Sequence, residues 1–158
     1  MIGSLPVEKG SYVLWLALED AIQVPVGRLG VVTFPRGDYF YLGSARGSGG
    51  LRGRLQHHLK ASNHPHWHID HFRPATIIRG VFYAMSGEPL ECIWSQALAE
   101  VVGAVNPVPG FGASDCQKGC SAHLVCFPKG IAREGVLSIL KKDEEGYPVL
   151  FMDIFEDK

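Results

Sequence analysis

The stretch that decides the fold is residues 39–58, YFYLGSARGSGGLRGRLQHH. Its first four residues are aromatic or aliphatic and follow turn formers, so they predict a strand over 39–42. Glycines at positions 47, 49 and 50 then break the chain. The segment that follows is predicted to be a helix over 51–59, because leucines recur there at the four-residue spacing of one helix face: Leu51, Leu55 and Leu59.

The polar residues of this stretch indicate an anionic ligand. Arg54 and His58 lie four residues apart on an adjoining face of the predicted helix, so both can reach one ligand. An arginine presents a fixed fork of donors that suits phosphate oxygens. A strand carrying Tyr41, a glycine loop and a helix with Arg54 and His58 together favour a phosphate-containing substrate.

A second stretch completes the pattern. Gly10-Ser11-Tyr12 opens the apolar run YVLWLAL, which predicts a buried, central strand over 11–18. Together with Tyr41-Leu42-Gly43, Arg54 and a predicted helix from Glu91, this order of motifs resembles the GIY-YIG endonuclease superfamily. The similarity is closest to its small Uri-type members, which also occur attached to endonuclease III. Further signatures are Gly43-Ser44-Ala45, Gly49-Gly50-Leu51, His66-Trp67-His68-Ile69-Asp70, Glu91-Cys92 and Gly110-Phe111-Gly112-Ala113-Ser114-Asp115-Cys116.

The resemblance covers roughly residues 9–127 and implies a single GIY-YIG-like nuclease domain of the α/β (α+β) class. Its small central antiparallel sheet would be flanked by helices. Residues 128–158 would form a C-terminal extension packed on the same domain, and 158 residues suit one domain rather than two. The implied activity is divalent-metal-dependent hydrolysis of nucleic-acid phosphodiester bonds, with DNA favoured over RNA and DNA-repair proteins as partners.

The resemblance also implies a role for each site residue. Tyr12 would help to deprotonate the attacking water, Tyr41 would orient the water or the phosphate, and Arg54 would stabilise the developing charge. Glu91 would be the single metal-binding glutamate, a hard oxygen ligand suited to Mg²⁺ or Mn²⁺. His58 matches a functional histidine of some restriction enzymes of the superfamily, but it equally fits a helix C-terminal cation, and both interpretations stay open.

Charge is unevenly distributed although the net charge is only −1. Between residues 27 and 79 the basic side chains outnumber the acidic ones, and every histidine except His123 lies in the same span. Such a block suits a phosphate backbone. The residues that we expect to contact nucleic acid are Arg46, Arg52, Lys60, His66 and His68. We expect His66, His68 and Asp70 either to line the substrate groove or to lock their segment by hydrogen bonds.

Two other functions compete with the nuclease. The run His66-x-His68-x-Asp70-His71 fits the H-x-H-x-D-H signature of dinuclear zinc hydrolases, although only His123 remains downstream as a further imidazole ligand. The other competitor is a non-catalytic nucleic-acid-binding module that retains the groove.

The cysteines raise a separate question. Cys116, Cys120 and His123 have the spacing C-x₃-C-x₂-H, and Cys92 could be a fourth member of a structural zinc site. The chain lacks an apolar run of roughly 20 residues and a signal peptide, so we expect an intracellular, cytoplasmic protein. Because reduced thiols packed in the core are ordinary there, the sequence favours reduced cysteines without stoichiometric zinc.

Periodicity and turn residues predict the remaining elements. We expect an extended piece over 23–26 and a hairpin that pairs 31–34 with 39–42. Residues 67–72 fit a short helix or a strand, and we favour the helix. The later elements that we expect are a strand at 76–85, a helix at 91–102, a strand at 122–127, a helix at 131–142 and a strand at 149–155.

Overall fold

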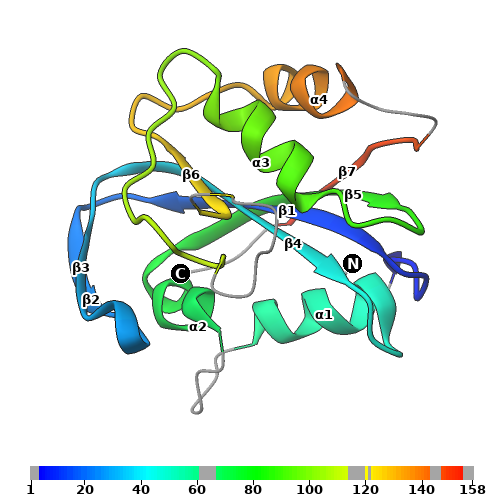
Figure 1. Ribbon diagram of the computed structural model, residues 1–158, viewed down its shortest axis with the longest axis horizontal. Helices are drawn as coiled ribbons and strands as arrows, with labels where there is room; N and C mark the ends of the chain where they lie inside the picture. Colours follow the sequence, from blue (N-terminus) through cyan, green and yellow to red (C-terminus); the bar gives the residue numbers. More distant parts are fainter. Residues whose placement is uncertain (1–3, 61–66, 114–119, 121, 143–146, 155–158) are drawn as a thin grey trace.

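The computed structural model describes residues 4–60, 67–113, 120, 122–142 and 147–154 (Figure 1). Its centre is a five-stranded antiparallel sheet in the order β6-β4-β1-β5-β7. The strands are β1 (Gly10–Leu18), β4 (Gly37–Ala45), β5 (Ile77–Met85), β6 (Leu124–Phe127) and β7 (Leu150–Asp153). The predicted mixed fold, an antiparallel sheet flanked by helices, is confirmed.

β1 occupies the middle of the sheet because both of its faces are apolar. Tyr12, Leu14 and Leu16 join one core cluster, whereas Val13 joins the other. Alternate residues of a strand point to opposite faces, so one run of apolar residues can serve two cores. The prediction of a central, buried strand over 11–18 is therefore confirmed.

Helices cover both faces of the sheet (Figure 1). α1 (Gly50–Leu59) and α2 (His68–Phe72) lie on one side, and α3 (Glu91–Ala99) and α4 (Arg133–Lys142) lie on the other. Leu51 and Leu55 bring α1 into the first cluster, while Trp94 and Leu98 bring α3 into the second. The short helix expected at 67–72 is present, and α3 ends three residues earlier than expected.

The predicted hairpin of residues 31–34 with 39–42 is wrong. β3 (Val31–Phe34) pairs instead with β2 (Ile22–Pro25) in a separate two-stranded sheet. β4 pairs with β1 on one side and β6 on the other, which leaves it no edge for β3. The chain changes sheets near Gly37, where a Cβ atom would lie 2.7 Å from the carbonyl oxygen of Phe127. Two apolar runs on either side of a turn motif therefore did not identify which strands pair with each other.

The C-terminal segment contributes to the same sheet. β7 pairs with β5, with Val81 opposite Met152, and thereby forms an edge of the sheet. Val136 and Leu140 of α4 pack in the cluster that also contains Trp94 of α3. Among the described residues, no helix is long and apolar enough to cross a membrane.

Candidate active site

Tyr12 and Gly43 face each other in the register of β1 and β4. A Cβ atom at Gly43 would lie 2.5 Å from the phenol oxygen of Tyr12 and 2.6 Å from Cζ. Only a residue without a side chain lets the tyrosine ring lie against β4 here. The glycine of the Tyr41-Leu42-Gly43 motif is therefore needed to seat the tyrosine of the Gly10-Ser11-Tyr12 motif.

The phenol oxygen of Tyr12 lies 2.7 Å from Nε2 of His58 on α1. Both side chains are almost fully buried. Burial lowers the pKa of His58 to about 3, helped by the neighbouring His57, so the imidazole is neutral near pH 7. Burial also raises the pKa of Tyr12 well above its ordinary value, and the charge of Arg54 opposes that rise. The pair is therefore a neutral phenol and a neutral imidazole.

The other ring nitrogen of His58, Nδ1, is buried and has no hydrogen-bond partner among the described residues. A neutral imidazole carries one proton, so either Nε2 accepts from Tyr12 or it donates to Tyr12. A buried neutral ring does not suit the role of a helix C-terminal cation. Of the two sequence interpretations of His58, the geometry favours contact with the site.

Arg54 and Tyr41 lie beside this pair. The Arg54 guanidinium is stacked on the ring of Trp67, with Cζ 4.6 Å from the ring centroid. Tyr41 packs edge-on against His58, with ring centroids 5.8 Å apart. Burial raises the pKa of Tyr41, and the positive charge of Arg54 again opposes the rise. β1, β4, α1 and the start of α2 thus bring these side chains together.

Asp70 fixes the segment that carries Trp67. Its carboxylate accepts a hydrogen bond from the Trp67 backbone N–H at 2.9 Å and lies 3.1 Å from Nε2 of His57. Asp70 is buried, whereas His57 is half-buried. Of the two roles expected for Asp70, the structure fits the locking one, because the contacts hold α2 against the C-terminal turn of α1.

Glu91 is the first residue of α3. Its carboxylate accepts a hydrogen bond from the hydroxyl of Ser44 on β4, whose oxygen lies 3.1 Å from that of Ser11 on β1. The negative charge of Glu91 contributes to the raised pKa values of both Tyr12 and Tyr41. Glu91 therefore lies within electrostatic range of the two tyrosines, although it comes from the helix on the opposite face.

The residues expected to contact nucleic acid differ in their surroundings. Arg46 donates through Nη1 to the Ser86 carbonyl at 2.8 Å, while its Nε and Nη2 are buried with no partner among the described residues. Arg52 donates through Nε to the carbonyl of Leu5 at 2.9 Å, which ties the N-terminal segment to α1. Lys60 is exposed. His68 accepts a hydrogen bond from the backbone of Gly112 at 2.8 Å, and His66 lies outside the described residues.

The segment with the H-x-H-x-D-H signature makes separate contacts in its described part. His68 bonds to Gly112, and Asp70 bonds to His57 and to the Trp67 backbone. Within the described ranges, the group of metal-ligating side chains that does converge is a different one.

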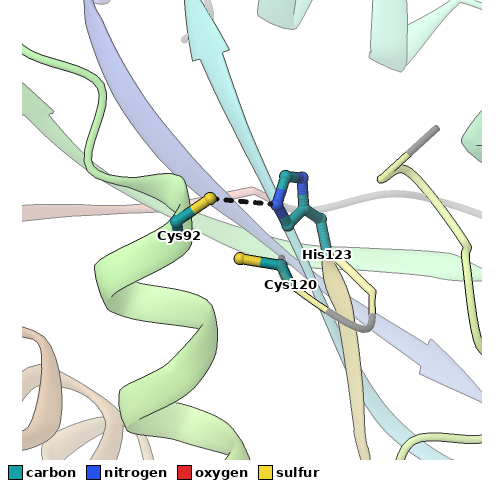
Figure 2. Close-up of side chains that lie close together, drawn as sticks. All are labelled: Cys92, Cys120 and His123. Carbon is teal, nitrogen blue, oxygen red and sulfur yellow. Dashed lines mark hydrogen bonds between the residues drawn. The ribbon is translucent and has the colours of Figure 1, made fainter. Parts of the chain in front are cut away.

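That group consists of Cys92, Cys120 and His123 (Figure 2). The three potential ligand atoms all lie within 4.8 Å of one another, and the Cys92 sulfur lies 3.5 Å from Nε2 of His123. The arrangement could hold a metal ion. Cys116, the other predicted member of this motif, lies outside the described residues.

Sequence reasoning missed several supporting contacts. His57 pairs with Asp70, thirteen residues later, and Trp67 lies under Arg54, also thirteen residues later. Residues 61–66, which lie outside the described part of the chain, separate the members of each pair, so no short periodicity links them. Ser44, which binds Glu91, was visible only as part of the Gly43-Ser44-Ala45 signature.

The fold is a small α/β domain built on an antiparallel sheet. Polar side chains gather around Tyr12 and His58, at one end of β1 and β4. A family model described as "Domain of unknown function DUF123" matches residues 11–142, and the chain belongs to that family. Comparisons with curated proteins and with solved structures found no match.

Proposed function

We propose that this chain is a divalent-metal-dependent endonuclease of the GIY-YIG type, which hydrolyses phosphodiester bonds in nucleic acid, with DNA favoured over RNA. The observation that carries the proposal is the convergence of Tyr12, His58 and Arg54 from two separate elements. The Tyr12–His58 hydrogen bond of 2.7 Å provides a direct route for a proton. The nearby guanidinium of Arg54 provides charge for a phosphate.

Each residue takes a role that its surroundings support. Arg54 binds a phosphate oxygen and stabilises the charge that develops on it, with Trp67 holding the guanidinium in place. Tyr41 positions the water or the phosphate.

Tyr12 and His58 handle the proton. As the water oxygen attacks phosphorus, Tyr12 takes a proton from the water and passes its own proton to Nε2 of His58. The leaving oxygen departs with the electron pair of the broken phosphorus–oxygen bond and takes a proton from solvent. Burial opposes a charged imidazole in the free protein. The added negative charge of a bound phosphate would act in the other direction and raise the pKa of His58.

Glu91 fits a single hard cation. Its carboxylate offers oxygen ligands, the Ser44 hydroxyl fixes its orientation, and one protein carboxylate is a usual anchor for Mg²⁺, which keeps several water ligands. When bound, the ion would supply positive charge to the phosphate oxygens. Mn²⁺ would suit the carboxylate equally, since both ions prefer oxygen ligands.

A binding module without cleavage is the second candidate. The raised pKa of Tyr12 favours it, because a phenol that stays protonated is a weak base. The experiment that separates the two functions incubates the full chain with labelled single-stranded, duplex and flap DNA and with RNA, in Mg²⁺ or in EDTA. The endonuclease predicts cuts that need Mg²⁺. Binding without cuts in every arm would support the module.

A further inference from the structure

The cluster of Cys92, Cys120 and His123 joins two parts of the chain that are far apart in sequence (Figure 2). Cys92 lies in the first turn of α3, directly after Glu91. His123 immediately precedes β6, and its backbone bonds to Leu42 of β4 and to Phe111. Cys92 and His123 are buried, whereas Cys120 is half-buried.

We propose that Cys92, Cys120 and His123 bind a structural zinc ion. A sulfur and a nitrogen on one tetrahedral zinc, at about 2.3 Å and about 2.0–2.1 Å from the metal, lie roughly 3.5 Å apart. The Cys92 sulfur and the His123 Nε2 are separated by 3.5 Å. Two thiolate sulfurs on the same ion lie about 3.8 Å apart, and all three ligand atoms already lie within 4.8 Å of one another. The trio supplies three of the four ligands of a tetrahedral site.

The charges of these ligands also suit a buried divalent cation. Two thiolates and one neutral imidazole balance the two positive charges of zinc, so the complex adds no net charge to a buried position. On binding, each thiol loses its proton to solvent, and zinc–sulfur bonds replace the sulfur–hydrogen bonds. Sulfur ligands disfavour Mg²⁺, which keeps this site chemically distinct from Glu91.

Cys126 shows the contrast with a buried thiol outside the cluster. It lies on β6 beside Tyr39, and burial raises its pKa to about 11. From the sequence alone, nothing places Cys92 near the other cysteines, so reduced thiols packed in the core are the ordinary expectation for all of them. The structure brings Cys92 of α3 into contact with His123.

A zinc ion here would brace the candidate active site. It would connect the first turn of α3, which carries Glu91, to the segment before β6. The hydrogen bond from Ser95 to the Ala122 carbonyl, at 2.8 Å, and that from Gln96 to the sulfur of Cys120, at 3.9 Å, also join that segment to α3. A Cβ atom at Gly112 would lie 3.0 Å from Tyr41 and 3.4 Å from the Cβ of His123, so the glycine lies between the two side chains. This bracing role rests on the proposed function, whereas zinc binding itself does not.

The test measures zinc in the full chain, purified without chelators, by elemental analysis. Wild type should hold about one zinc per chain. Cys120→Ser should lose it, and because Cys120 is only half-buried this variant should keep the fold, as checked by circular dichroism. Cys126→Ala, which removes a cysteine outside the cluster, should keep its zinc.

Cobalt provides an independent measurement. Chain stripped of metal and titrated with Co²⁺ should develop thiolate-to-cobalt charge-transfer absorption in wild type and in Cys126→Ala, but not in Cys120→Ser. Wild type without zinc even after purification in zinc-supplemented medium would overturn the proposal. Full zinc occupancy in Cys120→Ser would also overturn it. Neither result depends on nuclease activity, so failure here is distinguishable from failure of the proposed function.

Discussion

The phenol oxygen of Tyr12 lies 2.7 Å from Nε2 of His58, which joins the middle strand of the sheet to α1 across 46 positions of sequence. The phenol and the imidazole are each other's hydrogen-bond partners, and both are too deeply buried for water to take that role. The contact therefore couples stability and chemistry: the histidine is held neutral, and the tyrosine has an immediate neighbour that can take or give a proton.

The first prediction concerns the pH dependence of stability. In the folded protein the pKa of His58 is about 3, whereas the ordinary value is 6.5. Between these values the unfolded chain binds a proton that the folded chain does not. The stabilising contribution is therefore complete above pH 6.5 and is lost as the pH falls, at up to roughly 1.4 kcal/mol per pH unit.

Urea unfolding at pH 7, 6 and 5 measures this contribution. His58→Gln keeps a hydrogen-bonding group at the position but removes the titration, so its free energy of unfolding should fall less steeply over that range than that of wild type. Equal slopes for the two proteins would mean that His58 is not held neutral in the folded state.

The second prediction compares two glycines. Gly43→Ala would place a methyl group 2.5 Å from the Tyr12 phenol oxygen, so the ring or β4 must shift. We expect the free energy of unfolding to fall by about 1–3 kcal/mol. Gly53→Ala is the matched control: apart from its chain neighbours and the backbone of its own helix, no described atom lies within 4 Å of the added Cβ, and alanine in a helix should stabilise by about 0.5–1 kcal/mol. Thermal unfolding of both variants measures these changes. A Gly43→Ala variant as stable as wild type would contradict the close approach of the Tyr12 ring to β4.

Gly53→Ala also tests the approach of substrate. If the substrate backbone passes close to α1 at this position, the variant will be more stable but will bind nucleic acid more weakly. Unchanged affinity for nucleic acid would show that Gly53 is not needed for close approach of the substrate to α1.

The third prediction concerns the lock at Asp70. Asp70→Asn removes the negative charge of the carboxylate that accepts the hydrogen bond from the Trp67 N–H and contacts His57. Because Asp70 is buried, we expect a loss of about 1–3 kcal/mol in the free energy of unfolding. Asp153→Asn is the control, since Asp153 is exposed and lies 3.9 Å from Arg133; such pairs contribute about 1 kcal/mol or less. Equal losses in the two variants would refute a special role for Asp70.

The fourth prediction concerns salt. If the basic residues of α1 and Lys60, which follows its last residue, contact phosphates, the affinity for nucleic acid should fall steeply with ionic strength as counterions are released. Lys60→Ala should reduce the slope of log affinity against log salt by about 1. Lys141→Ala, at an exposed position on α4, should not change it. Fluorescence anisotropy over a series of salt concentrations measures the slope, and a salt-independent affinity would indicate another partner.

Local patterns were sufficient for most elements of the fold. The continuous apolar run of β1 predicted a central strand, and the leucines of α1 predicted its buried face. The partner of β3 was not predictable in the same way, because pairing depends on which strand has an open edge. Both edges of β4 are paired, one with β1 and the other with β6, and this follows from the order of strands in the whole sheet.

The same distinction between local patterns and long-range contacts applies to the candidate site. The motif order suggested Tyr12, Tyr41, Arg54 and Glu91, and the structure places Arg54 and Glu91 within electrostatic range of both tyrosines. Contacts between distant segments could not be read from spacing. The partnership of Cys92 with Cys120 and His123 needs α3 to lie against the segment before β6, and the sequence gives no distance between them.

The most direct test of the central claim is the rate of Mg²⁺-dependent DNA cleavage by wild type, Arg54→Ala and Arg133→Ala. Arg54 lies beside Tyr12 and Tyr41, whereas Arg133 is an exposed arginine on α4, across the sheet from α1 (Figure 1). We predict that Arg54→Ala lowers the cleavage rate by at least about tenfold with the fold intact, and that Arg133→Ala cleaves like wild type. Wild-type turnover by Arg54→Ala would contradict the assignment of this site.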